Sequence, residues 1–478
     1  MNYRMIKYIT GWLLIFESIF MAVPALTAVV YREYTELWCF LATMAGCLLL
    51  GGLMIFRKPK STALYAKEGF VIVSLSWIVL SLVGAIPFTL SGVIPSYVDA
   101  LFETVSGFST TGASILSEVE SLPHCMLMWR SFTHWVGGMG VLVFIMAFVP
   151  LSGGHNMHIM KAESPGPSVS KLVPRIRTTA LILYAIYLVL TFVMFILLLC
   201  FGMSSFEALN TAFATAGTGG FGFKNDSFLS FSPAIQIIVT VFMLLFSVNF
   251  SCYYLVLIRR FKDAFNAELR MFLIVVAVAI GAITLNISHM FSSVGEALRH
   301  AAFAVASLTS TTGFATVDFD IWPSLSKTFL VLIMFMGACA GSTGGGIKVS
   351  RILIAIKGIG RELGNMIHPH RVKKVMIDNR PLDNGAVHSV TVYLVTFALV
   401  FICSLVLLSF DRFDLVTNFT AVTATMNNIG PGLAEVGPTQ NYASFTVFSK
   451  LVLIFDMLAG RLELFPMLLL FKPGTWRK

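Results

Sequence analysis

The chain has 478 residues, 57% of them hydrophobic and 12% charged, and a net charge of +9. A soluble protein usually carries about 25% charged residues, so this composition excludes an ordinary soluble globular protein. Nearly uncharged runs of sufficient length, such as residues 181–209, 271–291 and 390–410, indicate membrane-spanning helices, because backbone polar groups have no water partner in lipid.

Two apolar runs, residues 9–30 and 38–56, begin the chain. The first follows Arg4 and Lys7 and could be read as a signal peptide. It is longer than a typical signal-peptide core, however, and a second apolar run follows at once. We therefore expect two retained transmembrane helices within residues 1–60.

After these helices a pattern recurs four times, roughly every 100 residues. Each unit has a long apolar run, a short run that cannot span a bilayer, a turn rich in glycine and hydroxyl residues, and a second long run. The short runs with their turns are residues 99–112, 207–220, 296–313 and 414–430. We assign the four repeats, the last of which also holds a cytoplasmic segment, to residues 61–155, 156–265, 266–360 and 361–478.

The short runs have the features of helices that stop inside the membrane. An acidic residue near the start of each would complement the positive end of a helix dipole, and Ser204–Glu207 and Ser293–Glu296 have capping-box spacing. A helix that ends half-way through the bilayer leaves its last carbonyls unpaired, and non-helical backbone at that depth survives only along a water-filled or ion-filled path. Four such turns around one axis would replace the hydration shell of a monovalent cation.

A single turn of this kind is common, and it is the fourfold recurrence that carries the inference. We predict an all-α polytopic membrane protein in which two N-terminal transmembrane helices precede four helix–pore-loop–helix repeats around one central pore. The proposed outer loops contain Arg32, Lys224, Arg299 and Arg412, whereas the basic clusters fall on the cytoplasmic side, as the positive-inside rule requires. The basic excess therefore reports topology and requires no nucleic-acid partner.

Residues 337–348, with the sequence GACAGSTGGGIK, interrupt the long run that follows the third turn. Each glycine costs a helix roughly 1 kcal/mol relative to alanine, so we expect the helix to break here. A nucleotide-binding P-loop would place Lys and Ser/Thr directly after Gly346, where Ile347 stands instead. Helix packing through small residues remains the alternative interpretation.

Arg461 lies within the last apolar region, and an intramembrane arginine usually faces a partner or a cavity. An ion pair with Asp456 or Glu463, or extension of the side chain to the inner surface, would also explain it. Glu17, Arg130 and His134 also lie in or near apolar runs, and we interpret them as packing or interfacial residues.

At the four turns the chain resembles the Trk/Ktr/HKT superfamily of potassium transporters, and specifically its TrkH/TrkG-type membrane subunits. The motifs that carry the resemblance are STTG at 109–112, GTGG at 217–220, STTG at 310–313 and MNNIGPG at 426–432. The resemblance covers nearly the whole chain and implies potassium uptake across the bacterial inner membrane. The fourth motif departs from the other three, so exact fourfold symmetry of the ion sites is not expected.

The resemblance also assigns roles to particular residues. Glycine at Gly112 implies selectivity for potassium, since some plant relatives with serine there favour sodium. Residues 337–348 become an intramembrane gate beneath the filter, with Lys348 at its cytoplasmic end and Arg461 pointing at the constriction. The potassium-binding filter residues are expected to be Thr110, Thr111, Gly112, Thr218, Gly219, Gly220, Thr311, Thr312, Gly313, Asn427, Asn428, Ile429 and Gly430. The gate residues are expected to be Gly341, Ser342, Thr343, Gly344, Gly345, Gly346, Lys348 and Arg461.

Partners follow from the resemblance alone. It implies a homodimer in the lipid bilayer with both termini cytoplasmic, and a cytoplasmic TrkA-type regulatory subunit that binds ATP, ADP or NAD. The sequence predicts no cofactor within this chain; potassium is the expected substrate. Alternating apolar residues and an Asp-Asn pair in residues 371–382 predict a short cytoplasmic hairpin.

Other functions stay open at the level of sequence. Sodium transport is the most serious alternative. A secondary transporter with broken helices would usually place charged or aromatic groups beside them to hold an organic substrate, whereas these turns offer hydroxyls and backbone. An intramembrane enzyme would need to recruit His134, His155 or His158, and none has an obvious acid, nucleophile or metal-ligand partner by spacing.

Overall fold

The computed structural model describes residues 1–476 apart from 58, 60–64, 141–175 and 369–373. His155, His158 and the expected boundary between the first two repeats lie outside the described residues. Within the described part, six helices are long and apolar enough to cross a membrane. A seventh span results if α11 (Pro233–Ser247) and α12 (Phe250–Leu257) are counted together. The predicted all-helical polytopic membrane fold is confirmed.

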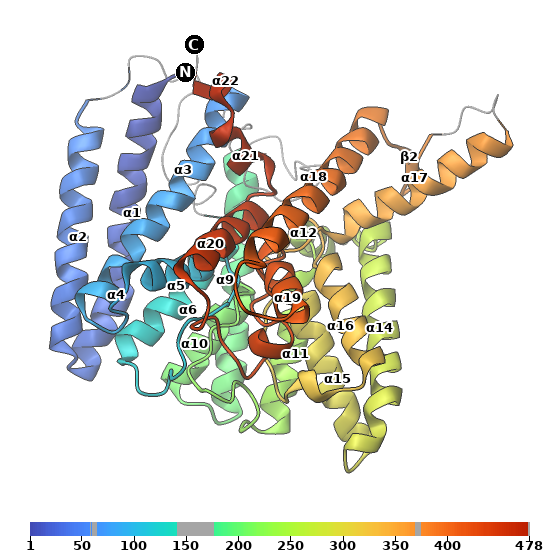
Figure 1. Ribbon diagram of the computed structural model, residues 1–478, viewed down its shortest axis with the longest axis horizontal. Helices are drawn as coiled ribbons and strands as arrows, with labels where there is room; N and C mark the ends of the chain where they lie inside the picture. Colours follow the sequence, from blue (N-terminus) through green and yellow to red (C-terminus); the bar gives the residue numbers. More distant parts are fainter. Residues whose placement is uncertain (58, 60–64, 141–175, 369–373, 477–478) are drawn as a thin grey trace.

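Two N-terminal helices, α1 (Tyr3–Tyr31) and α2 (Tyr34–Ile55), form a hairpin at one side of the molecule (Figure 1). Gly11 and Gly51 allow the two helices to approach closely, because a Cβ at Gly51 would lie 2.8 Å from the Gly11 carbonyl oxygen. Such small-residue contacts are how helices pack in lipid, where no hydrophobic effect drives them together. The hairpin packs against the first repeat through α3 (Ala66–Gly84) and α6 (His124–Gly138).

The remaining elements follow the predicted order. The first repeat is completed by α4 (Ile86–Leu90) and α5 (Tyr97–Phe108), and the second by α9 (Ile176–Cys200), α10 (Ser205–Ala216) and α13 (Phe261–Ala264). The third holds α14 (Ala267–Ile287), η1 (Ser288–Met290), α15 (Val294–Thr309), η2 (Phe319–Ile321), α16 (Ser324–Met336) and α17 (Val349–Ile367). The fourth holds β1 (Met376–Ile377), β2 (Arg380–Pro381), α18 (Asn384–Leu408), α19 (Leu415–Met426), η3 (Ala434–Val436), α20 (Val447–Arg461), α21 (Phe465–Phe471) and α22 (Pro473–Trp476).

The short helices are α5, α10, α15 and α19, and the three of 12 residues reach only about 18 Å. Ser204 and Glu207 form the predicted reciprocal capping box of α10. At α15 the prediction is only half right: Ser293 accepts from the Glu296 amide, but the Glu296 carboxylate accepts from Ser292 instead. Ser96 and Asp414 cap the other two helices.

The helices that follow the turns are all interrupted, whereas the sequence predicted a break only in the third repeat. The α6 helix ends at Gly138, and α11 is bent by 91° where it meets α12. The α20 helix ends at Arg461, and the chain resumes as α21 after Glu463 and Leu464, two non-glycine residues with positive φ. Leucine, glutamate and asparagine at these breaks carry no strong breaking signal in sequence.

The predicted hairpin is present, with β1 and β2 paired antiparallel around the positive-φ residues Asp378 and Asn379. Figure 1 shows that it joins α17 to α18 at a point that projects from the helical body. The two termini lie close together on one side, where the Tyr3 hydroxyl donates to the Trp476 carbonyl at 3.0 Å.

Candidate functional site

The four turns that follow the short helices share one backbone path. Each places a non-glycine residue at positive φ and a glycine at positive φ two positions later. The first member has φ near 55–60° at Thr110 (57°), Thr218 (55°), Thr311 (61°) and Asn428 (54°). The glycines are Gly112 (80°), Gly220 (80°), Gly313 (84°) and Gly430 (96°). The shared conformation arises from different residue types, so the turns are equivalent in backbone even where the sequence departs.

The turns meet one another in a closed ring. A Cβ at Gly112 would collide with the Gly219 backbone of the second turn, and one at Gly220 with Thr312 of the third. A Cβ at Gly313 would collide with Ile429 of the fourth turn. The ring closes because a Cβ at Gly430 would press on the carbonyl oxygens of residues 111 and 112 in the first turn. Only glycine permits this approach at all four positions.

The ring offers carbonyl oxygens that the chain itself does not use. No hydrogen bond within the described residues ends on the carbonyl oxygens of Thr110, Thr111, Thr218, Gly219, Thr311, Thr312, Asn428 or Ile429. These residues are buried, and a buried carbonyl without a partner costs stability unless something else binds it. All four ring glycines also line one hollow of about 190 Å³ that opens on the other side of the turns from their helices. The ring can therefore replace water around a dehydrated cation that enters from the hollow.

Several side chains of the turns stabilise the ring itself. The Thr111 and Thr312 hydroxyls each lie 2.7 Å from the serine hydroxyl two residues earlier. In the fourth turn the Asn428 amide donates to the Thr111 hydroxyl and to the Met457 carbonyl, both at 2.9 Å. Asn428 therefore joins the first turn to the last one, a role that its place in a divergent motif did not reveal.

Residues 337–348 form a hairpin loop whose ends are fastened together. The amides of residues 347, 348 and 349 donate to the carbonyls of residues 335, 336 and 338. Gly337 and Gly346, both at positive φ, pack against each other so closely that neither has room for a Cβ. The predicted break in this helix is confirmed, and it is a defined loop with a closed base.

The tip of this loop contacts all four repeats just beneath the turns. The Gly345 amide donates to the Thr311 hydroxyl of the third turn at 2.7 Å, and Gly345 lies against the Asn427 carbonyl of the fourth. The Thr343 hydroxyl donates to the Phe246 carbonyl in the second repeat. Arg461 links the loop to the first repeat. A segment with neighbours in all four repeats lies across the axis that the turns surround.

Arg461 bonds to backbone oxygens on both sides of that axis. Its guanidinium donates to Thr343 in the loop at 2.9 Å and to Gly137 and Gly138 at the end of α6, at 2.5 and 2.9 Å. The acids considered as its partners have other contacts: Asp456 accepts from Ser404, and Glu463 pairs with Arg351. The structure thus gives Arg461 a pore-facing set of contacts.

Lys348 is buried at the closed base of the loop, and its ammonium group donates to the Gly344 carbonyl. Ser342 is likewise tied within the loop, to the Cys339 carbonyl. Gly341 accepts from the Phe250 amide at the bend between α11 and α12. The expected gate residues are therefore brought together in one place.

Two further residues hold this loop, and sequence reasoning missed both. Glu268, in the first turn of α14, accepts from the amides of Ala340 and Ser350 at 2.7 and 3.1 Å, so one carboxylate binds both arms of the loop. Arg351, which follows the loop, pairs with Glu463 and lies 3.9 Å from the centre of the Tyr393 ring. An acid at a helix start reads as a dipole partner, so only the fold shows what Glu268 binds.

Comparison with known proteins agrees with this geometry over the full chain. The TrkH family, described as cation transport protein, matches residues 38–477. The Trk system potassium uptake protein TrkH of Escherichia coli K12 is 38% identical over 487 residues, with all of both chains covered. TrkG of the same organism is 30% identical, with 99% of each chain covered.

A solved structure is also similar over its whole length. The crystal structure of the potassium transporter TrkH from Vibrio parahaemolyticus superposes with a TM-score of 0.89 at 34% identity, and all of both chains is covered. The breaks and turns described above therefore belong to a fold with an experimental representative. The chain belongs to the TrkH family of cation transport proteins, and it is a membrane transport protein, not an enzyme.

Proposed function

We propose that this protein takes up potassium ions across the bacterial inner membrane through the ring of four turns. The observation that carries the proposal is the ring itself: buried, unpaired carbonyls from four repeats around one hollow. The relatives are named as potassium uptake proteins, which supports the choice of ion. The selectivity filter comprises residues 110–112, 218–220, 311–313 and 427–430.

Selection in this proposal is a balance of hydration against carbonyl binding. An ion loses its water as it leaves the outer hollow, and ring oxygens replace that water. The short helices direct their negative C-terminal ends at the ring, because each ends one residue before its turn begins. An inside-negative potential adds about 2.3 kcal/mol per 100 mV for each monovalent cation. This supplies the driving force without a nucleotide site in the chain.

Residues 341–346, with Lys348 and Arg461, act as the gate in this proposal. The loop tip lies across the path, and the Arg461 guanidinium adds a positive charge beneath the filter that opposes a cation. The loop is attached to the ring by few polar contacts, chiefly the Gly345–Thr311 hydrogen bond. It can therefore move while the ring stays assembled.

We infer that opening is controlled by a cytoplasmic TrkA-type subunit that binds ATP, ADP or NAD, and that the protein is a homodimer. The relatives' names place them in a Trk system, which supports the presence of partner components. In this orientation both termini and the hairpin between α17 and α18 face the cytoplasm. The division into residues 1–60, 61–155, 156–265, 266–360 and 361–478 belongs to the same proposal.

The experiment that tests this function is growth of a bacterium that lacks its own potassium uptake systems. The chain is expressed with and without a TrkA-type subunit, and rubidium and sodium uptake are measured in parallel. Rescue at low potassium, with rubidium uptake well above sodium uptake, is expected. Sodium uptake alone, or no rescue by protein present in the membrane, would overturn the potassium assignment.

A further inference from the structure

A face of α6 links the first and second repeats directly behind the ring. Arg130 and His134 are one helical turn apart on this helix, and both are buried. The Arg130 guanidinium donates to the Gly222 carbonyl at 3.0 Å and lies 4.2 Å from the centre of the Phe221 ring. Both partners follow Gly220 directly, so Arg130 holds the outer end of the second turn.

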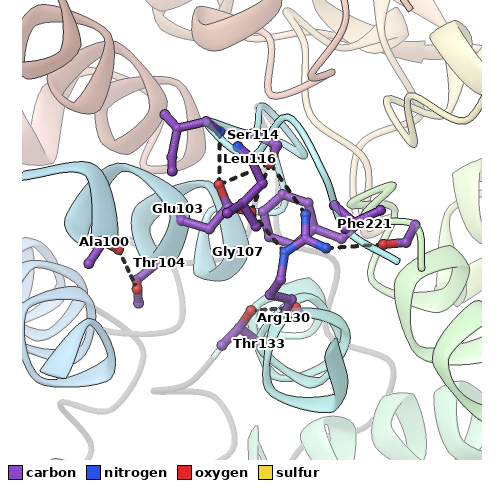
Figure 2. A network of polar contacts seen from close by, with 12 residues as sticks. Ala100, Glu103, Thr104, Gly107, Ser114, Leu116, Arg130, Thr133 and Phe221 are labelled. Carbon is purple, nitrogen blue, oxygen red and sulfur yellow. Dashed lines mark hydrogen bonds and ion pairs between the residues drawn. The ribbon is translucent and has the colours of Figure 1, made fainter. Parts of the chain in front are cut away.

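The opposite side of the Arg130 guanidinium is fixed by the first repeat. Its Nε donates to the Glu103 carboxylate of α5 at 2.8 Å, and both side chains are almost fully buried (Figure 2). Glu103 also accepts from the Ser114 hydroxyl and from the Ile115 amide, both about 3.0 Å away. These two residues follow Gly112, so the one carboxylate holds the outer end of the first turn.

His134 makes the same link one helical turn deeper. Its Nδ1 donates to the Gly107 carbonyl of α5 at 2.9 Å, and its Nε2 accepts from the Phe221 amide at 3.2 Å. This pair of partners requires a neutral ring with hydrogen on Nδ1. The ring also fills the space beside Gly219, where a Cβ would strike it. His134 therefore joins the first short helix to the second turn.

This arrangement is confined to one corner of the ring. Glu103 lies six residues before Ser109, and the corresponding positions in the other short helices are Thr211, Ala304 and Ala421. None of these can carry a carboxylate partner for a buried arginine. The ring, nearly equivalent in backbone at four corners, has a charged connection at the corner between the first and second turns.

We propose that Glu103, Arg130 and His134 form an inter-repeat brace that sets the spacing of the first two turns and thereby the discrimination of potassium from sodium. This inference rests on the proposed function of the ring as a filter. Because Arg130 also lines the outer hollow, Glu103 has a second effect. It neutralises a positive charge that would otherwise repel cations arriving at the filter.

The two effects can be separated by charge. Glu103→Gln leaves the Arg130 charge uncompensated, Arg130→Gln leaves the carboxylate uncompensated, and the double variant restores neutrality without the ion pair. Rubidium and sodium uptake, and the apparent KM for rubidium, are measured in the potassium-uptake-deficient bacterium with each full-length variant, per amount of protein in the membrane. Glu17→Gln is the matched control, because Glu17 is equally buried but lies on α1, outside the four repeats.

All three variants are expected to raise the ratio of sodium to rubidium uptake severalfold, while Glu17→Gln leaves it unchanged. Glu103→Gln should also raise the apparent KM for rubidium, Arg130→Gln should not, and the double variant should return it close to the wild-type value. A purely structural role would lower the amount of protein and the maximal rate in all three without altering the ratio. An unaltered ratio overturns the proposal.

If the glutamine variants do not reach the membrane, Arg130→Lys decides the question. Lysine keeps the charge but cannot bond to Glu103 and Gly222 in the same planar geometry. A relaxed ratio supports the brace, and a wild-type ratio overturns it. If the wild-type chain itself takes up no rubidium, the proposed function fails; if it is selective and the variants are equally selective, the brace alone fails.

Discussion

The ring of turns and the loop beneath it both depend on glycine, but their neighbours differ. At the ring, each glycine faces the backbone of a different repeat, so four separate parts of the chain hold one another in place. In the loop, Gly337 and Gly346 face each other, and the base is closed by the loop's own backbone. The tip reaches the ring through the Gly345–Thr311 hydrogen bond.

This difference separates selection from gating. A ring whose parts lie in mutual backbone contact cannot change at one corner without displacing the next one. A loop with its own closed base can move as a unit when a few polar contacts break. The predictions below test whether the two regions respond independently.

Deleting residues 341–346 should have the largest effect. The deletion removes the loop tip but keeps the residues that pair at its base. Rubidium uptake without a regulatory subunit should rise by about tenfold or more, because the obstruction is lost from a pore whose ring is intact. The ratio of rubidium to sodium uptake, measured in the same cells, should stay at the wild-type value. Reduced uptake at normal protein levels would instead show that the loop supports the ring.

Gly112→Ser should have the opposite profile. The added Cβ collides with the Gly219 backbone, and serine is strained at the φ of 80° found here. We expect the preference for rubidium over sodium to fall about tenfold, equivalent to about 1.4 kcal/mol. Gly281→Ser is the matched control, because a Cβ at that position on α14 meets no atom within 4 Å. An unchanged ratio in Gly112→Ser would remove this residue from the filter.

Glu268→Gln should have a smaller effect, confined to the gate. A neutral amide accepts more weakly than a carboxylate from the Ala340 and Ser350 amides, and charge-assisted hydrogen bonds are roughly twice as strong as neutral ones. Uptake without a regulatory subunit should rise about twofold to threefold, with unchanged selectivity. Glu362→Gln, at an exposed ion pair on α17, serves as the control. A change in ion preference instead of in basal uptake would contradict the separation.

Asp414 should show the smallest effect, on stability alone. The hydrogen bond from the Thr417 side chain holds the pKa of this N-terminal cap of α19 below its usual value. The stabilisation is therefore present at pH values above the ordinary pKa of aspartate and is lost as pH falls through the lowered one. Thermal unfolding of the purified protein should show this loss between neutral and acidic pH, and Asp414→Asn should reduce it. An identical pH dependence in the variant would assign it to other groups.

Local features of this fold could be predicted from the sequence, and long-range contacts could not. The short helices and their turns were expected because apolar runs, capping residues and glycines act over a few positions; α10 with its capping box is an example. The breaks after α11 and α20 were missed because they depend on tertiary contacts. The cyclic order of the ring followed from no local signal.

The charged residues show the same limit. Arg130 and His134 were interpreted as packing residues, since their partners Glu103 and Gly222 lie 27 and 92 positions away from Arg130. For Arg461 the sequence left an acidic partner open, and the structure gives carbonyls of Gly137, Gly138 and Thr343. Residue type alone cannot distinguish an arginine that binds carboxylates from one that binds backbone oxygens.

The closure of the ring also sets an order of events during synthesis. Asn428 donates to Thr111 across 317 positions of sequence, and Gly430 packs against the same turn. A ribosome that adds about 5–20 residues per second needs roughly 15 s to a minute to make the intervening chain. For that time the first turn resides in the membrane without its last neighbour. A nascent chain halted before the fourth repeat therefore exposes an incomplete ring, which a membrane protease or chaperone can recognise as unfinished.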